Sequence, residues 1–342
     1  MRAITFHEPF DVRVSELREP VLVAPRDAIV RVTATAICGS DLHPYRGHER
    51  GLERGTVLGH EFTGVIEALG PELGGLRLGQ RVASPFSTNC GDCPACRRGL
   101  PARCVHGELF GWVQDGRGLH GGQSERVRVP LADTTLVAVP DAVDDAGALL
   151  AGDVFATGSF AAELAGLGTG DRVAVIGCGP VGICAIAASR RRGASEVIAI
   201  DRDPARLDLA ARFGARPLPA DAAADDPSAQ QLDAVLECVG QPAATRLAYR
   251  LLRHGGTLAA VGVHTEAALA ITPGELYDKN LSYRAGRCPA RRFLPELLAR
   301  IAAGENGLAA LFSHRLPLAA GPEAYRMFDE RRDGCTKVML VP

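Results

Sequence analysis

Four cysteines fall within fifteen residues of the sequence, in the spacing C-x2-C-x2-C-x7-C (Cys90, Cys93, Cys96 and Cys104). Closely spaced thiolates can wrap a tetrahedral Zn²⁺ with every coordination position filled by protein, which makes a closed, structural site. An iron–sulfur cluster also takes four thiolates, and a bacterial ferredoxin run begins with the same spacing. In that run about three residues separate the third cysteine from the fourth, and a proline follows the fourth. Here seven residues separate Cys96 from Cys104, and Val105 follows. The quartet therefore favours a structural zinc.

A second group of possible metal ligands is spread more widely along the chain. The segment from Cys38 to His43 reads CGSDLH, and the segment that begins with Gly59, His60 and Glu61 reads GHEFTG. Taken singly, Cys38 is better explained as a small buried hydrophobe, and His60 as a core histidine with satisfied hydrogen bonds. Together the two segments supply a thiolate, an imidazole and oxygen donors, the ligand types of a catalytic zinc with one open position.

A glycine-rich turn follows a strand-like segment and opens a helix-like one. Its residues, in a GxGxxG arrangement, are Gly177, Cys178, Gly179, Pro180, Val181 and Gly182. The glycines permit a tight turn, close approach of the backbone to a diphosphate and close packing of helix on strand, while the helix N-terminus attracts the phosphates. An ordinary glycine-rich turn is the alternative, but the strand, the helix and a carboxylate downstream together favour dinucleotide binding.

That carboxylate is Asp201, nineteen residues after the last glycine. A carboxylate at this place accepts hydrogen bonds from the adenosine ribose and repels a 2′-phosphate, so it indicates NAD rather than NADP. Arg202 and Arg206 act in the opposite direction, because a guanidinium can bind that phosphate. We give the carboxylate more weight, because Arg202 can flank the adenine and Arg206 can face solvent.

The composition narrows the class of protein. The chain has 342 residues, 46% of them hydrophobic, and a net charge of −2. It can bury a sizeable core in two domains, and its scattered basic residues do not indicate a nucleic-acid or membrane partner. The apolar stretch 173–189 is interrupted by glycines and a proline, which indicates strand, turn and helix rather than a membrane span. With no signal-peptide layout at Met1, we expect a cytoplasmic protein.

The pattern of elements changes near residue 150. Before it, short strands are expected between glycines and prolines, at 29–35, 62–68, 81–83 and 127–129. After it, strands are expected at 172–176, 196–201, 233–239 and 257–262, alternating with helices at 181–192, 204–213 and 243–253. This alternation predicts a parallel, doubly wound sheet and an α/β fold. The last fifty residues predict a helix near 294–303 and a strand at 337–341, with less regular segments between them.

Taken together and in their order, these motifs resemble the zinc-containing medium-chain alcohol dehydrogenase family, over essentially the whole chain. The resemblance implies a GroES-like, β-rich catalytic domain made of residues 1–150 and 288–342. It places a Rossmann NAD-binding domain at residues 151–287, with a cleft between the two domains where zinc and nicotinamide meet.

The resemblance also implies roles for single residues in the metal site. Cys38 and His60 match ligands of the catalytic zinc, and Asp153 stands where many relatives have a cysteine and some branches a carboxylate. Glu61 resembles a residue that either approaches the metal or stays behind its ligands. Asp41 resembles the partner that orients His60.

Further roles concern the substrate and the cofactor. Ser40 and His43 match the positions of a proton relay, and Phe86 matches a substrate-pocket position; Phe110, Trp112 and Phe155 are weaker pocket candidates. Gly39 stands where some relatives carry a basic residue toward the pyrophosphate, so we expect Lys337 either to compensate or to be a solvated surface lysine. Further cofactor contacts are expected at four residues at the ends of the later strands or directly after them: Val239, Val261, Gly262 and Val263.

These expectations describe an NAD-dependent zinc alcohol or polyol dehydrogenase with two zinc ions per chain. Its partners would be a small alcohol or carbonyl substrate and further copies of the chain, as a homotetramer or a dimer, with no nucleic acid and no membrane. Two alternatives stay open: a zinc-free quinone or enone reductase of the same fold, and a non-enzymatic nucleotide-binding protein. Linear alcohols, polyols, cyclitols and aldehydes all remain possible substrates.

Overall fold

The computed structural model describes residues 1–305 and 307–342, which divide into two compact units. One unit consists of Met1–Ala156 and Pro289–Pro342, and the other of Thr157–Cys288. The two ends of the chain therefore belong to the same unit, and the central segment forms a unit of its own.

The central unit is built on a six-stranded parallel sheet in the order β12-β11-β10-β13-β14-β15. Its strands are β10 (Arg172–Ile176), β11 (Glu196–Asp201), β12 (Arg216–Pro219), β13 (Leu232–Glu237), β14 (Leu252–Ala260) and β15 (Ser282–Ala285). Its helices are α6 (Pro180–Arg191), α7 (Pro204–Arg212), α8 (Pro242–Leu251) and α9 (Pro273–Asp278). This strand order is that of a doubly wound dinucleotide-binding sheet, which confirms the predicted α/β class.

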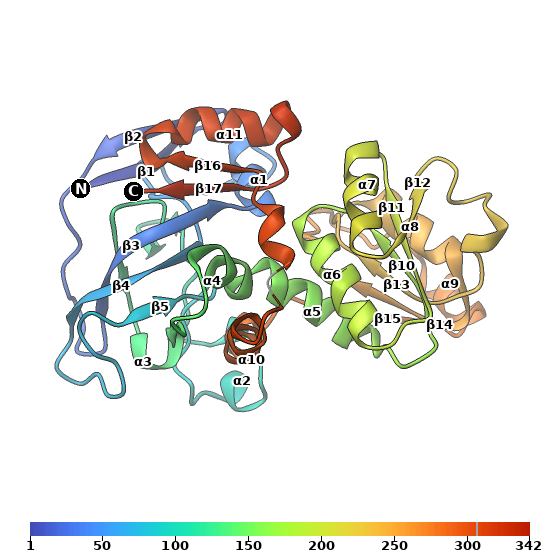
Figure 1. Ribbon diagram of the computed structural model, residues 1–342, viewed down its shortest axis with the longest axis horizontal. Helices are drawn as coiled ribbons and strands as arrows, with labels where there is room; N and C mark the ends of the chain where they lie inside the picture. Colours follow the sequence, from blue (N-terminus) through green and yellow to red (C-terminus); the bar gives the residue numbers. More distant parts are fainter. Residues whose placement is uncertain (306) are drawn as a thin grey trace. The chain divides into compact units, whose positions relative to one another are not determined.

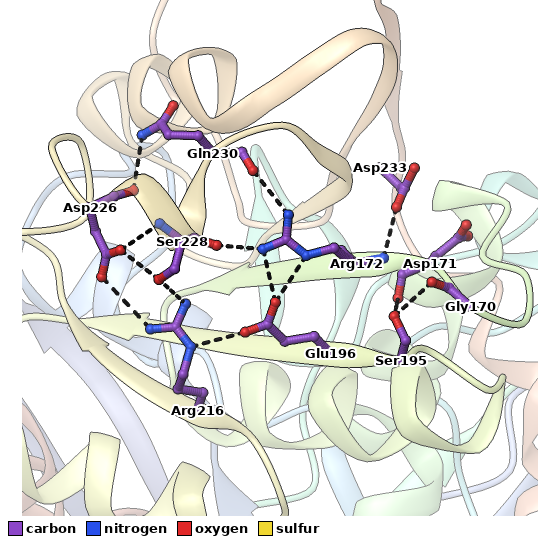
Figure 2. A network of polar contacts seen from close by, with 10 residues as sticks. All are labelled: Gly170, Asp171, Arg172, Ser195, Glu196, Arg216, Asp226, Ser228, Gln230 and Asp233. Atoms are coloured by element: carbon purple, nitrogen blue, oxygen red, sulfur yellow. Dashed lines mark hydrogen bonds and ion pairs between the residues drawn. The ribbon is translucent and has the colours of Figure 1, made fainter.

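A network of charges ties together the amino ends of these parallel strands (Figure 2). Glu196, the first residue of β11, accepts hydrogen bonds from Arg172 of β10 at 2.9 and 3.0 Å and from Arg216 of β12 at 3.0 Å. The backbone N–H of Arg172 donates to Asp233 of β13 at 2.8 Å, and the Arg172 guanidinium also donates to the carbonyl of Gln230. The network thus links four neighbouring strands, β12, β11, β10 and β13, at or near their amino ends.

The other unit contains a seven-stranded sheet, ordered β16-β17-β3-β4-β5-β9, with β8 also paired to β3. Its strands are β3 (Ala28–Ile37), β4 (Glu61–Leu69), β5 (Arg81–Ala83), β8 (Arg126–Val129), β9 (Val137–Ala138), β16 (His314–Pro317) and β17 (Val338–Val341). Two separate hairpins accompany the sheet: β1 (Arg2–Glu8) with β2 (Asp11–Glu16), and β6 (Trp112–Gln114) with β7 (Arg117–Leu119).

The end of the chain returns to this sheet. In Figure 1 the red strand β17 lies between the blue strand β3 and the other red strand, β16. β17 pairs antiparallel with β3, with Val338 opposite Ile37, and Val338 and Leu340 are fully buried. Burial of this apolar strand fixes the residue before it, Lys337, next to the end of β3.

The helices of this unit were only partly predicted. They are α1 (Leu42–Tyr45), α2 (Pro94–Arg97), α3 (Ala132–Thr135), α4 (Asp145–Gly152), α10 (Ala290–Ala302) and α11 (Gly321–Glu330), while α5 (Val154–Ala165) continues into the central unit. The segment expected to be less regular contains α11, which buries Ala324, Tyr325 and Phe328 against the sheet. Among the described residues no single helix has the length and apolar character of a membrane span, although α4 and α5, bent by 41° at their junction, pass that test as a pair.

Candidate functional site

The pairing of β3 with β4 brings two of the predicted ligands together. The two strands run antiparallel with Ala36 opposite Glu61, so Cys38, just after β3, comes close to His60, just before β4. Both side chains are buried or nearly so. Residues far apart in the sequence are thus joined by the register of one strand pair.

Asp153 comes from the junction between α4 and α5. Its backbone torsions, φ −143° and ψ −80°, are not helical, and its side chain is nine-tenths buried. One of its oxygens, Oδ2, lies 3.3 Å from the Cys38 Sγ and 3.4 Å from the His60 Nε2. With Glu61, these residues place four possible ligand atoms within 4.8 Å of one another.

The charge states of this buried cluster are set by burial and by the contacts among its members. Burial and the nearby Asp153 and Glu61 carboxylates raise the pKa of Cys38 to about 11, so its thiol stays protonated at neutral pH unless a metal displaces the proton. Burial opposes ionisation of both His60 and Asp153. Their mutual contact outweighs it, helped by Asp41 at His60 and by Glu61 and Lys337 at Asp153. The pKa of His60 is therefore well above 6.5, and that of Asp153 is below its usual value. A thiol, an imidazole and carboxylates in one buried cluster match the donors of a catalytic zinc.

Lys337 faces this cluster from the opposite strand. Its Nζ lies 2.7 and 2.8 Å from the two Glu61 carboxylate oxygens and donates to the Ile37 carbonyl at 3.3 Å. Burial opposes the charge of Lys337, but Glu61 raises the lysine pKa above its usual 10.5. Burial and Asp153 raise the pKa of Glu61 to about 7 even though Lys337 lowers it.

The expectation of a solvated surface lysine is therefore wrong, because Lys337 is fully buried. The contacts of its ammonium are made with Glu61 and Ile37, so the structure gives no support to the expected contact with a cofactor pyrophosphate. Sequence reasoning missed this role because the pairing of β17 with β3, which positions the lysine, joins segments three hundred residues apart.

Two further residues of the first motif lie against His60. Asp41 Oδ1 is 3.1 Å from His60 Nδ1, and Asp41 Oδ2 accepts the backbone N–H of Cys38 at 2.9 Å. When the ring is neutral, as a metal ligand must be, the carboxylate selects the tautomer in which Nδ1 carries the hydrogen and Nε2 has the free lone pair. Ser40 Oγ lies 3.4 Å from His60 Nε2, while His43 is half-buried in α1.

The cysteine quartet forms a second group of four possible ligands. Its shortest sulfur–sulfur distances, 3.6 Å from Cys93 to Cys96 and 3.9 Å from Cys93 to Cys104, exclude a disulfide at these pairs. Backbone hydrogen bonds around Cys96 and Val105 lower the pKa of Cys93 to about 6. Burial and the contact with Cys93 raise the pKa of Cys96 to about 12. Convergent thiols that already accept backbone N–H groups are suited to a closed zinc site.

In the central unit, the predicted glycine-rich turn joins β10 to α6. Gly177 has φ +90°, and Gly182 has no room for a side chain, since a Cβ there would lie 1.8 Å from the Gly177 carbonyl oxygen. The helix begins at Pro180, with Val181 in its first turn and Gly179 as its N-cap. The glycines of this turn place no side chain of their own over the start of the helix, as the close approach of a diphosphate requires.

Asp201 lies at the end of β11, beside this turn. Its Oδ2 accepts the Cys178 backbone N–H at 2.7 Å, and its Oδ1 accepts that of Asp203 at 3.0 Å. Arg202 is exposed. The expectation that Arg206 faces solvent is wrong, because its guanidinium lies 3.9 Å from Asp201 Oδ2 and next to Gly179.

One buried carboxylate of the central unit was missed from the sequence. Glu237, at the end of β13, accepts the backbone N–H groups of Val239 at 2.7 Å and Gly240 at 2.8 Å, and lies 2.9 Å from His264 Nε2. Through these contacts Glu237 fixes the turns that carry the expected cofactor residues. Of those residues, Val239 and Val263 are exposed, and Val261 and Gly262 are half-buried. The sequence did contain a signal for Glu237, because an acidic residue at the end of an otherwise largely apolar strand is unusual.

The candidate pocket aromatics separate into two kinds. Phe86 is buried with its ring 6.5 Å from the His60 ring, and Trp112 lines a surface cavity of about 520 Å³ on the β6–β7 hairpin. Phe110 packs on Phe62 in the core of the sheet, and Phe155 is fully buried beneath Arg300. Phe110 and Phe155 are therefore core residues.

Comparison with known proteins gives a consistent result. Residues 24–141 match the model of the alcohol dehydrogenase GroES-like domain, and residues 180–303 match that of the zinc-binding dehydrogenase family. Zinc-type alcohol dehydrogenase B of Aspergillus flavus is 37% identical, over 96% of this chain and 79% of that protein.

Solved structures show the same likeness. Alcohol dehydrogenase TADH from Thermus sp. ATN1 matches with a TM-score of 0.93 and 38% identity, over 100% of this chain and 99% of that one. An alcohol dehydrogenase of Escherichia coli CFT073, solved with NADH, matches with a TM-score of 0.87 and 26% identity, over 100% and 99%. By its motifs, its fold and its likeness to these relatives, the chain belongs to the zinc-containing medium-chain alcohol dehydrogenase family.

Proposed function

We propose that the protein oxidises an alcohol to an aldehyde or ketone with NAD, or runs the reverse reaction, at the cluster of Cys38, His60 and Asp153. The observation that carries this proposal is the convergence of a thiol, an imidazole and a carboxylate in one buried cluster whose atoms lie within 4.8 Å. This cluster also argues against a zinc-free quinone or enone reductase, which needs no such set of ligands.

Zinc bound there supplies Lewis acidity, which lowers the pKa of an alcohol hydroxyl far enough for its proton to leave. Cys38, His60 and Asp153 would hold the ion, and Asp41 would keep His60 Nε2 turned toward it through its contact with Nδ1. Glu61, whose charge Lys337 balances, is available as a further oxygen donor next to the ligands.

The chain's own residues remove the proton. Ser40 Oγ, close to His60 Nε2, would accept the hydroxyl proton of the substrate while it releases its own proton toward His43 of α1, which would pass that proton to solvent. Phe86 forms an apolar wall beside His60, which excludes water from the reacting carbon.

NAD bound to the central unit supplies the acceptor for the hydride. Gly177, Gly179 and Gly182 give its diphosphate access to the start of α6. Asp201 accepts hydrogen bonds from the adenosine ribose, and the exposed apolar side chains of Val239 and Val263 are offered to the rest of the cofactor.

We further propose a reducing compartment and a homo-oligomer. The quartet and Cys38 are thiols whose proposed role requires that they stay reduced, which is normal in the cytoplasm. The homotetramer, or dimer, implied by the family resemblance stays a prediction.

The proposed function is tested by NADH absorbance with a panel of linear alcohols, polyols and cyclitols. The wild-type protein is expected to reduce NAD with at least one class. Ser40→Ala is expected to lower kcat/KM by about a hundredfold or more, since it removes the first proton acceptor. The matched control is Ser189→Ala, which removes a buried hydroxyl of α6 that donates to the Ala185 carbonyl. Absence of NAD reduction across the panel would contradict the function, and full activity of Ser40→Ala would remove that hydroxyl from the mechanism.

A further inference from the structure

A continuous line of buried polar contacts runs from α11 to His60. Tyr325 Oη is 2.9 Å from Gln123 Oε1, and Gln123 Nε2 lies 3.2 Å from the Ala36 carbonyl and 3.4 Å from Asp41 Oδ2. Asp41 in turn contacts His60 Nδ1 at 3.1 Å. Gln123 and Tyr325 are fully inaccessible to solvent.

The direction of each hydrogen bond in this line follows from its chemistry. The Ala36 carbonyl and the Asp41 carboxylate accept only, so the amide group of Gln123 that faces them must be its NH₂. Its oxygen then faces Tyr325, whose hydroxyl must donate. Burial and the charge of Asp41 raise the pKa of Tyr325 well above 10, which keeps that hydroxyl protonated.

The chain is also shaped to admit this glutamine. Gly59, directly before His60, has φ +88°, and a Cβ on it would lie 2.3 Å from Gln123 Cγ. Gln123 is fixed at its backbone as well, because its N–H donates to the Leu58 carbonyl at 2.9 Å and its carbonyl accepts from Ile4 at 2.8 Å. The turn that presents His60 therefore has space for the Gln123 side chain only while residue 59 is glycine.

We propose that Gln123 and Tyr325 are positioning residues for the metal site, acting on His60 through Asp41. The Asp41 carboxylate is held at both ends: Oδ1 faces His60, while Oδ2 accepts from Cys38 and Gln123. This arrangement fixes the plane of the carboxylate and thereby the orientation of the imidazole, and Tyr325 fixes the amide that does so. The inference rests on the proposed function, because it assumes that His60 is a ligand of the catalytic zinc.

Removing either group leaves a buried polar partner unsatisfied and frees the carboxylate to turn. Tyr325→Phe removes one oxygen and keeps the ring that packs in the core. Gln123→Met keeps the length of the side chain but removes both of its hydrogen-bonding groups. Both variants should leave the cysteine quartet unchanged, so its zinc serves as an internal reference.

The experiment measures the rate at which the full-length protein loses its catalytic-site zinc to a chromophoric chelator, and the visible spectrum of cobalt placed at that site. Tyr325→Phe and Gln123→Met are each expected to release the ion about tenfold faster and to shift the cobalt bands. The double variant should be no worse than the more affected single variant, because both residues act through one line. Tyr45→Phe is the matched control, since its ring contacts Tyr325 in the same core but lies outside the line.

A wild-type release rate and cobalt spectrum in Tyr325→Phe would overturn the inference, and this variant is decisive even if Gln123→Met does not fold. The inference is also overturned if Tyr45→Phe accelerates zinc release as much as Tyr325→Phe does. A wild-type protein that takes up no ion at Cys38, His60 and Asp153 would overturn the proposed function, and the inference with it.

Discussion

At the scale of single residues, the sequence predicted the candidate metal ligands better than it predicted the residues that contact and position them. Cys38, His60 and Asp153 could be named in advance because their motifs resemble a known family, and the structure brings them together. Lys337 was assigned wrongly, and Gln123 and Tyr325 were missed. Their roles depend on partners about two to three hundred residues away, which no local pattern reveals.

We propose that Asp201 decides the preference between NAD and NADP. Its carboxylate disfavours a 2′-phosphate, but Arg206, 3.9 Å away, would attract one once the carboxylate is removed. The wild type is expected to have a higher kcat/KM with NAD than with NADP, and Asp201→Gly should lower that ratio by about tenfold or more. Steady-state kinetics with both cofactors measures this ratio. Asp208→Asn, an exposed carboxylate of α7, is the control; a wild type that prefers NADP would refute the argument.

At the scale of elements, the central strands and the helices between them were predicted (β10, β11, β13, β14, α6, α7 and α8), because buried parallel strands are continuous apolar runs and these helices have clear starts. The shorter β12, β15 and α9, and α5 that leads into the unit, were missed. The other unit was harder. Its short strands and α4 carry little periodicity, and α11 was not recognised although its buried face packs on the N-terminal hairpin and β17. Strand register, which positions the site, was not predictable from the sequence because it depends on pairing between distant segments.

The charge network at the amino ends of the parallel strands should stabilise the central unit in a pH-dependent way. Burial opposes ionisation of Glu196, but Arg216 and Arg172 outweigh it and lower its pKa below 4.5. A lowered folded-state pKa means that the stabilisation is present at neutral pH and is lost as the pH falls below about 4.5. Glu196→Gln is therefore expected to lower the free energy of unfolding by about 1 kcal/mol at pH 7, with a smaller difference at pH 4.

Urea denaturation at the two pH values measures this effect. Glu163→Gln is the control, since its carboxylate lies 3.9 Å from the Arg192 guanidinium, a longer contact than those of Glu196. Equal losses for both variants, or a loss for Glu196→Gln that does not depend on pH, would count against the network.

At the scale of the whole molecule, the chain assigns its two metal sites to one unit and its dinucleotide turn to the other. The cluster of Cys38, His60 and Asp153 is buried, and we expect that substitution of one of these ligands removes the metal ion without unfolding the chain. A zinc ion bound by the quartet would instead cross-link the long segment between β5 and β6, so loss of that ion should lower the stability of the unit. The two sites can therefore be separated by the consequences of losing each.

The most direct measurement is the zinc content of purified protein, determined by elemental analysis for the wild type and two variants. The wild type should hold close to two zinc ions per chain. Asp153→Ala should keep one ion and its fold but lose alcohol oxidation, and Cys93→Ser should lose the other ion together with much of its thermal stability. One zinc ion in the wild type, with Asp153→Ala unchanged in metal content and activity, would contradict the assignment of the catalytic site.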